Sequence, residues 1–176
     1  MSERREFFKK FKKPLQPTKD EAILRPPYGL SESLFQSECI KCEEKFCATH
    51  CDEGIIIIKE DGTPTLSFKK SGCTFCDECA LSCKSGVLSL EHKDTSDKIN
   101  ATFQINFESC MAHNKTICFS CKEPCIDDAI LFNGMFNPII DSDLCTGCGF
   151  CISRCPTNAI YYDIIKIKGN EHELEK

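Results

Sequence analysis

Cysteine dominates this chain: 16 of its 176 residues are cysteines, and they fall into four groups of four. In the second and fourth groups the spacing is C-x2-C-x2-C-x3-C, and Pro156 follows the fourth directly. The other two groups are wider. The groups are Cys39, Cys42, Cys47 and Cys51; Cys73, Cys76, Cys79 and Cys83; Cys110, Cys118, Cys121 and Cys125; and Cys145, Cys148, Cys151 and Cys155. Such a recurring spacing predicts a repeated metal-binding loop.

The two intact runs have the bacterial signature of a loop that holds a 4Fe–4S cluster through thiolates. Three closely spaced cysteines can wrap around one side of the cubane, and the fourth thiolate of the run binds the other cluster of a two-cluster module. We therefore predict four 4Fe–4S clusters with crossed ligation. Cys83 would complete the site of the first group and Cys51 that of the second. Likewise, Cys155 would complete the site of the third group and Cys125 that of the fourth.

Three other uses of the cysteines are less consistent with this pattern. Disulfides suit small secreted chains of this cysteine density, but no export segment is evident and cross-linking needs no four-fold motif. Zinc sites usually pair two C-x2-C knuckles across a longer gap, whereas here three close cysteines precede a fourth. Buried structural thiols would need no regular spacing at all.

The composition predicts a core that is partly inorganic. Hydrophobic residues make up 41% of the chain, but this count includes the cysteines, and without them it falls to about 32%. That is a small apolar fraction for a domain of this length. If clusters complete the core, their binding energy is also folding energy, and the metal-free chain should be largely unfolded or aggregated.

Strand signals accompany the cysteine groups in both halves. The first group is followed by GIIIIKEDGTPTLSF and the third by AILFNGMFNPII, and each reads as a strand, an Asp-Gly or Asn-Gly turn and a second strand. Residues 87–88 and 159–162 read as short strands, and 101–107 alternates apolar and polar side chains as a half-buried strand does. Short helical turns are expected after the last cysteine of each group.

We therefore expect an α+β fold of two tandem bacterial-ferredoxin-like modules, each built around two 4Fe–4S clusters. The first and second groups start 34 residues apart and the third and fourth 35, so the halves match as duplicated units. The expected modules cover residues 31–95 and 96–165. Residues 1–30 would form a basic, mostly flexible N-terminal tail, and residues 166–176 a charged C-terminal tail.

The N-terminal residues resemble the start of a twin-arginine export signal. Residues 4–9 read RREFFK, but KFKKP follows, so the apolar run of about 7–15 residues that export requires is missing. We expect the tail to be retained. Six basic and two acidic residues among the first thirteen, interleaved with phenylalanines, leave two interpretations open. The tail is either solvated or a contact arm for a partner or for anionic lipid, with weak peripheral membrane contact.

Charge and hydropathy restrict location and partners. The longest apolar run, Gly54 to Ile58, is far shorter than the roughly 20 residues of a membrane-spanning helix. Reduced thiols favour the cytoplasm. The net charge is −5, and four thiolate-ligated clusters would bring it to about −13. An acidic body argues against nucleic acid as a partner and suits docking onto a basic patch of another protein.

No motif indicates an enzyme. Every cysteine is assigned to a cluster, no nucleophile stands beside a plausible base, and there is no glycine-rich phosphate loop. The four histidines, His50, His92, His113 and His172, are scattered along the chain. A hydrogen bond from His50 to a cluster is conceivable from its position beside Cys51, but a surface position is the simpler expectation.

The stretch RPPYGLSESLFQSECIKC at residues 25–42, the order of the motifs and the seven-residue gap between Cys110 and Cys118 resemble the NapF family. These are cytoplasmic ferredoxin-type accessory proteins of periplasmic nitrate reductase systems. The twin-arginine-like start without an apolar continuation is also similar to NapF and unlike the exported NapG and MauM proteins. One departure is clear: four residues separate Cys42 from Cys47, where the family has two. The extra residues would either bulge harmlessly or make that cluster labile.

The resemblance implies four 4Fe–4S clusters and an interaction with the catalytic subunit NapA before its export. It also implies a role in the maturation of that subunit, through loading or reduction of its own cluster. The chemistry of the residues alone is equally consistent with an electron-transfer subunit that relays single electrons between a quinol or dehydrogenase partner and an acceptor. The identity of the partner separates these two functions.

Overall fold

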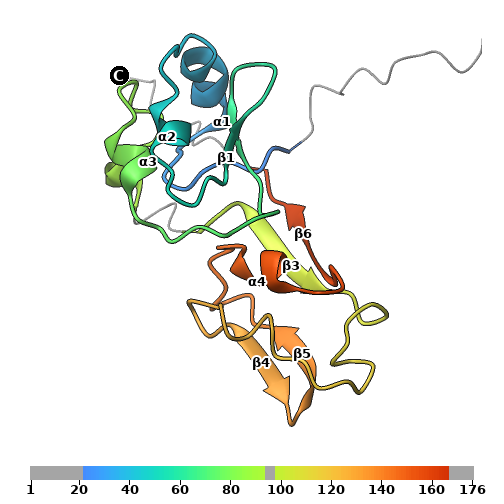
Figure 1. Cartoon of the computed structure of the whole chain (residues 1–176). Helices are drawn as coiled ribbons and strands as arrows, with labels where there is room; N and C mark the ends of the chain where they lie inside the picture. The colour runs from blue at the N-terminus through green and yellow to red at the C-terminus, as the bar shows by residue number, and fades with distance from the viewer. Residues whose placement is uncertain (1–21, 94–97, 167–176) are drawn as a thin grey trace, which may run out of the picture.

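The computed structural model describes residues 22–93 and 98–166. These ranges form two lobes, which we call the first lobe (22–93) and the second lobe (98–166) (Figure 1). The twin-arginine-like segment, residues 1–21 of the expected N-terminal tail and residues 167–176 of the expected C-terminal tail lie outside the described residues, so the choice between a solvated tail and a contact arm stays open. In the described part of the chain, no helix is both long and apolar enough to cross a membrane.

The first lobe consists of short elements between its cysteines. They are α1 (Glu32–Leu34), a π-helical turn (Phe35–Cys39), α2 (Phe46–Thr49), β1 (Ile56–Ile58), β2 (Pro64–Leu66), α3 (Glu78–Leu81) and a 3-10 turn (Leu90–His92). The hydroxyl of Ser31 caps α1 by accepting from the amide of Leu34 at 3.4 Å. β1 and β2 pair antiparallel, with Ile57 opposite Thr65, which confirms the predicted hairpin.

The second lobe has longer strands. Its elements are β3 (Ala101–Ile105), β4 (Ile130–Asn133), β5 (Phe136–Ile140), α4 (Phe150–Arg154) and β6 (Ile160–Ile164). β4 and β5 form the second predicted hairpin, with a register shift at Phe132/Asn133. β3 pairs antiparallel with β6 over five residue pairs, and Phe103 and Ile105 are buried between exposed neighbours. The half-buried strand predicted from alternation at 101–107 is therefore confirmed, and it ends at Ile105.

The helical turns lie elsewhere than expected. We expected them after the last cysteine of each group, but α2, α3 and α4 contain the third cysteine: Cys47, Cys79 and Cys151. The physical reason is the C-x3-C spacing. Four positions are about one helical turn, so a single turn carries the chain from the third cysteine to the fourth.

Residues 24–29 belong to the core of the first lobe, which corrects the expectation that the flexible tail extends to residue 30. Leu24 and Tyr28 are only 2% and 1% exposed. The carbonyl oxygen of Leu24 accepts hydrogen bonds from the Leu66 amide at 2.9 Å and the Thr65 hydroxyl at 2.8 Å. Prolines 26 and 27 favour extended backbone, and that conformation lets the segment lie along the β1–β2 hairpin.

The same sequence of elements occurs in both lobes. Each lobe has a lead-in segment, a cysteine loop, a hairpin, a second cysteine loop and a closing segment that returns to the lead-in. In the second lobe the lead-in and closing segments are β3 and β6. In the first lobe they meet only at one bridge, between Gly29 and Leu88.

The apolar core continues from one lobe into the other. The rings of Phe68, Phe103 and Tyr162 pack together, with centroids 5.5 to 5.9 Å apart. Phe68 belongs to the first lobe and the other two to the β3–β6 pair. At the edge of this contact the side-chain amide of Asn100 donates to the carbonyl oxygens of Ile23 and Ile165, both at 2.9 Å. The two lobes are therefore packed against each other through side chains of both.

Candidate metal centres

The sixteen thiols gather into four sets, and each set mixes three cysteines of one group with one of the neighbouring group. Three sets line cavities of the protein. The fourth set is identified by its electrostatics. After burial, the nearby thiols of Cys47 and Cys83 are what raise the pKa of Cys39, so the three cysteines lie close together. We name them site 1 (Cys39, Cys42, Cys47, Cys83), site 2 (Cys51, Cys73, Cys76, Cys79), site 3 (Cys110, Cys118, Cys121, Cys155) and site 4 (Cys125, Cys145, Cys148, Cys151). These are the sets that crossed ligation predicts.

The backbone around the cysteines bends in a way that turns amides toward sulfur. Phe75 lies in the left-handed region with φ of 52°, and its N–H donates to the sulfur of Cys73 at 3.4 Å. The closing segments do the same: the amide of Leu88 reaches Cys83 at 3.4 Å and that of Ala159 reaches Cys155 at 3.2 Å. An N–H that points at a thiolate stabilises its negative charge, so these loops suit anionic sulfur ligands.

In every site, burial raises the pKa of at least one thiol. It raises the pKa of Cys39, Cys47, Cys73 and Cys121 to about 11 and that of Cys79 to about 12, with a further contribution from neighbouring thiolates. The pKa of Cys151 is raised even further for the same reasons. At neutral pH these thiols keep their protons unless positive charge stands among them. Binding of iron would therefore release protons, as it does at thiolate metal sites generally.

The donor sets fit a cluster, whose requirements differ from those of a single ion. No group of three or more His, Cys, Asp or Glu side chains among residues 22–93 and 98–166 is close enough to hold one metal ion. A cubane instead offers a separate iron corner to each thiolate, so its four sulfur ligands need not converge on one point. Site 2 surrounds a cavity of about 270 Å³. The residues of site 2 thus match the chemistry of a 4Fe–4S cluster, because four cysteine sulfurs line a common space, and the other three sites offer the same set of four cysteine donors.

The widened loop of the first group is held by a lysine. Lys45 lies in the left-handed region with φ of 49°, and its ammonium donates to the carbonyl oxygens of Cys39 and, at 2.7 Å, of Gly62 in the hairpin turn. The extra residues between Cys42 and Cys47 are therefore tied to the β1–β2 turn. Of the two outcomes expected for this insertion, the contacts favour an accommodated bulge.

The seven-residue gap in the third group is held by an asparagine. The side-chain amide of Asn114 donates to the carbonyl oxygens of Phe107 at 3.2 Å, Glu108 at 3.0 Å and Cys110 at 2.8 Å. Thr116 closes the same loop with a backbone bond to the carbonyl of Met111 at 2.9 Å. The chain between Cys110 and Cys118 is thus a closed turn.

Site 2 also includes residues that lie within the expected N-terminal tail. Pro27 and Tyr28 line its cavity, and the Tyr28 hydroxyl donates to the carbonyl oxygen of Phe75 at 3.4 Å. Burial, and then the neighbouring Asp77 carboxylate, raise the pKa of Tyr28, so the phenol keeps its proton. An aromatic residue directly after two prolines and ahead of a cysteine group was the available signal for this role.

The described histidines make other contacts. A ring nitrogen of His50 lies 3.0 Å from the carbonyl oxygen of Phe46, and the residue is exposed, as the simpler expectation had it. A ring nitrogen of His113 lies 2.9 Å from the carbonyl oxygen of Pro138. These positions give neither histidine a hydrogen bond to a cysteine sulfur.

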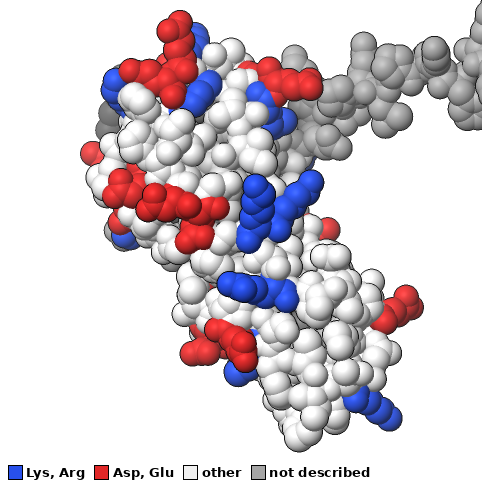
Figure 2. All heavy atoms as spheres, viewed as in Figure 1, with Lys and Arg blue, Asp and Glu red and all other residues white. Residues whose placement is uncertain are grey.

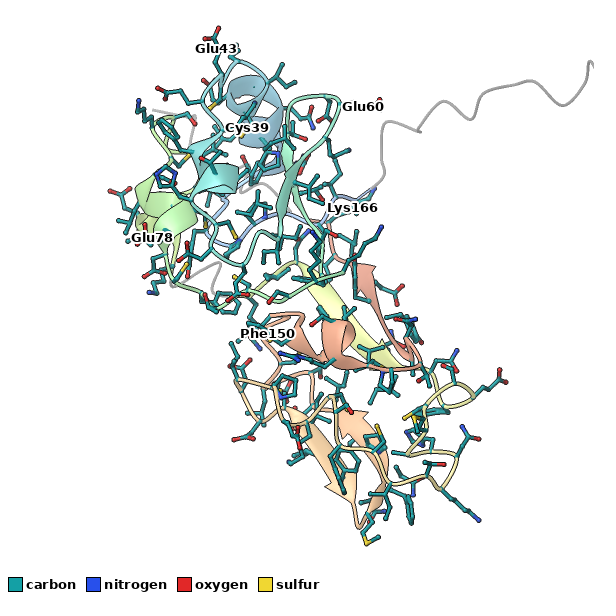
Figure 3. All side chains as sticks on the ribbon, in the orientation of Figure 1. Cys39, Glu43, Glu60, Glu78, Phe150 and Lys166 are labelled. Carbon is teal, nitrogen blue, oxygen red and sulfur yellow. The ribbon has the colours of Figure 1, made fainter. Side chains whose placement is uncertain are left out.

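Acidic groups are prominent on the first lobe, while in the same view basic groups lie where the lobes meet (Figure 2). Figure 3 labels three of the acidic residues, on different sides of the lobe. The exposed carboxylates between residues 40 and 80 are Glu43, Glu44, Asp52, Glu60, Asp61 and Glu78. The surface around sites 1 and 2 therefore carries negative charge even before any cluster charge is counted.

Short helical turns, paired strands and four-cysteine sites define a class: this is a ferredoxin-type iron–sulfur protein with mixed helix and strand. Residues 138–161, which include all four cysteines of the last group, match the model of the 4Fe-4S binding domain family.

Over most of its length, the chain is similar to ferredoxin-type proteins. The chain is 33% identical over 141 residues to ferredoxin-type protein NapF of Escherichia coli (strain K12), covering 78% of this chain and 82% of that one. It is 30% identical over 148 residues to ferredoxin-type protein NapF of Haemophilus influenzae, with 81% and 80% covered. It also matches the methylamine utilization ferredoxin-type protein MauM of Methylophilus methylotrophus, at 28% identity over 158 residues, with 80% and 69% covered. The chain belongs to the NapF family of ferredoxin-type proteins.

Proposed function

We propose that this protein binds four 4Fe–4S clusters, one at each of sites 1 to 4, and assists the maturation of a periplasmic nitrate reductase. The lobes then act as two tandem ferredoxin-like modules of two clusters each. The partner is a NapA-like catalytic subunit, met in the cytoplasm before its export. When bound, the clusters supply one-electron redox chemistry.

The observation that carries the proposal is the gathering of all sixteen thiols into four crossed sets. The chain supplies the sulfur ligands, the amides that point at them and the buried surroundings. Tyr28 and Phe75 line the cavity of site 2 and would shield part of a cluster there from water, while the side with Cys76 is exposed. Exposure of a cluster to water affects its reduction potential. Family membership supports the choice of partner.

The charge of the first lobe supports docking onto a basic surface of that partner. Complementary charge increases association rates and selects partners more than it adds affinity. We expect that reversal of two exposed carboxylates, Glu43→Lys with Glu60→Lys, weakens binding to the NapA precursor and reduces its dependence on salt. The matched control is Glu108→Lys with Glu123→Lys, which makes the same charge change at exposed positions of the second lobe.

The clusters and the partner are tested separately. Anaerobic purification should yield about sixteen iron and sixteen sulfide per chain, because each cluster contains four of each. A value near eight would reject the four-cluster proposal. For the partner, affinity purification from anaerobic extract should recover a nitrate reductase precursor that still carries its signal peptide. Failure to retain purified precursor at low salt would reject that part.

A second function, electron transfer between a quinol or dehydrogenase partner and an acceptor, has one observation in its favour. Cys76 of site 2 is exposed, so one site lies near the surface, where single electrons can be exchanged with a docked protein. Recovery of the chain at fixed stoichiometry in a membrane redox complex, in place of the precursor, would favour this function.

A further inference from the structure

The two lobes meet at a backbone hydrogen bond between two site cysteines. The N–H of Cys73, in site 2, donates to the carbonyl oxygen of Cys148, in site 4, at 2.6 Å. A ligand of the first lobe and a ligand of the second are therefore joined by one hydrogen bond.

This approach depends on two glycines. A Cβ atom on Gly72 would stand 2.5 Å from the amide nitrogen of Phe150 and 2.7 Å from the carbonyl oxygen of Cys148. A Cβ atom on Gly149 would stand 2.3 Å from the ring of Phe68. Figure 3 labels Phe150 where the lobes meet. Each glycine precedes or follows a bridge cysteine, and each faces the opposite lobe, so the two backbones interlock.

The surroundings of the bridge are buried and firmly packed. The ring of Phe68 lies against Gly149 and packs with the rings of Phe103 and Tyr162. Asn100 closes the junction by accepting from the amide of Arg25 at 2.9 Å and by donating to two carbonyls. Electron tunnelling falls exponentially with distance, so a contact that is both short and rigid is what efficient transfer needs.

The other two sites make their contacts within their own lobes. Site 1 is tied to the first lobe by Lys45, through the carbonyls of Cys39 and Gly62. The cavity of site 3 is lined by second-lobe residues such as Met111 and Pro156. The cavities of sites 2 and 4 are likewise lined by residues of one lobe each, but Cys73 of site 2 and Cys148 of site 4 also bond across the junction. We therefore call sites 2 and 4 the inner pair, and sites 1 and 3 the outer pair.

We propose that Gly72, Cys73, Cys148 and Gly149 form the electron bridge between the lobes, which places the four sites in the order 1, 2, 4, 3. This inference rests on the proposed binding of clusters at these sites. In the crossing, the core at site 2 is oxidised by one electron and the core at site 4 is reduced by one, or the reverse. No bond is made or broken and no proton moves. The electron comes from an external one-electron reductant, for which dithionite serves in the test.

The order of sites is tested with two partial proteins. Cys42→Ala with Cys118→Ala disables sites 1 and 3 and leaves the inner pair, so we call this variant the inner-pair protein. Cys76→Ala with Cys145→Ala disables sites 2 and 4 and leaves the outer pair, so we call it the outer-pair protein. Each protein should hold about eight irons. After reduction with dithionite, electron paramagnetic resonance of the inner-pair protein should show spin–spin splitting between its two clusters. The outer-pair protein should show the sum of two isolated spectra.

The bridge itself is tested by Gly72→Ala in the inner-pair protein. Gly72 does not lie in the left-handed region, so alanine there acts through contact with the other lobe and not through backbone strain. The splitting should shrink. The matched control is Gly29→Ala, whose Cβ would stand 2.4 Å from the ring of Phe35 inside the first lobe. This control should lower stability but leave the splitting unchanged.

Several results would overturn the bridge. They are coupling in the outer-pair protein, absence of coupling in the inner-pair protein, and splitting that survives Gly72→Ala. If a partial protein fails to retain eight irons, the two glycine variants are compared in the full chain. There Gly72→Ala must slow the spin relaxation of the reduced clusters and Gly29→Ala must not, and equal relaxation would reject the bridge. A wild-type chain with fewer than about sixteen irons would instead reject the four-cluster function, so the two failures are distinguishable.

Discussion

Each lobe has one cysteine loop that is longer than the C-x2-C-x2-C-x3-C run, and the two lobes hold the extra residues in different ways. In the first lobe the extra residues are held by an ammonium group, that of Lys45, which bonds two carbonyl oxygens. In the second lobe a neutral amide, that of Asn114, bonds three. In both cases one polar side chain adds hydrogen bonds to backbone carbonyls of the longer loop. The comparison teaches that loop length can vary at such a site if a polar side chain ties the insertion to the surrounding backbone.

The lobes also differ in what joins their first and last segments. The second lobe uses five residue pairs of β3 and β6. The first has one bridge, Gly29–Leu88, and instead buries the guanidinium of Arg25, which is 1% exposed. That group bonds both oxygens of Glu32 and, at 2.6 Å, the carbonyl oxygen of Pro64, and it lies 4.6 Å from the centre of the Phe35 ring. Strand pairing holds one lobe, and a buried charge network holds the other.

Removal of iron has the largest expected effect. Without clusters both lobes lose the centre of their cores, so the metal-free, reduced chain should show no cooperative melt. Any residual protection from hydrogen exchange should be confined to β3 and β6, because this pair does not depend on a cysteine loop. The measurement is hydrogen exchange with mass spectrometry beside calorimetry. A native-like melt of the metal-free chain would contradict the expectation.

The second-largest effect is expected for Arg25→Met. It should lower the free energy of unfolding of the first lobe by roughly 3 kcal/mol, because Glu32 and the Pro64 carbonyl lose a charged donor. Thermal release of clusters, followed by visible absorbance, should occur earlier for about half of the iron. The second lobe serves as the internal control. Equal acceleration of both halves would show that the lobes do not differ in the proposed way.

Lys45 and Asn114, which hold the two long loops, should have smaller effects, each confined to its own lobe. Lys45→Met should lower the free energy of unfolding by about 1–2 kcal/mol and make site 1 labile. Asn114→Ala should lower it by about 1 kcal/mol and affect site 3. The measurement is the rate of iron release to a chelator under anaerobic conditions. Each variant is the control for the other. Release from the wrong lobe, or no change in either, would refute the clamp role.

The smallest effect is a dependence on pH. Burial alone would raise the pKa of Glu32, but hydrogen bonds from Arg25 and Gln36 outweigh it and hold the pKa below its ordinary value of 4.5. The ion pair therefore stabilises the fold above about pH 4.5, and this contribution is lost as the pH falls through the lower folded-state pKa. Glu32→Gln should lower stability by under about 1 kcal/mol at neutral pH. The difference in free energy of unfolding between this variant and wild type should shrink in acid. Denaturant unfolding at several pH values checks this, and a difference that grows in acid would contradict the prediction.

Elements that depend on neighbouring residues were predictable. Both hairpins follow from an Asp-Gly or Asn-Gly turn between apolar runs, and β3 follows from its alternation. The crossed sets follow from the spacing of the cysteines, because the size of the cubane dictates how far apart its ligands stand along the chain. The helical turns were predicted at the wrong positions, because a pattern of only four or five residues is too short to show a helical period.

Other features arise from residues distant in the sequence. Arg25 and Pro64 are 39 positions apart, and Cys73 and Cys148 are 75 apart. The basic residue and the prolines of RPPY would usually mark a linker, and the aromatic Tyr28 after them was the one local signal of a buried position.

By itself, the sequence determined the kind of protein: sixteen cysteines at cluster spacing, with apolar runs around turns, permit little besides a small iron–sulfur fold. Only the tertiary structure decided how the two lobes meet, which two sites lie at their contact, and which side chains close the long loops. The reason is physical. Ligand spacing and turns are set by covalent distance along the chain, whereas packing between lobes depends on shapes that form only when distant segments come together.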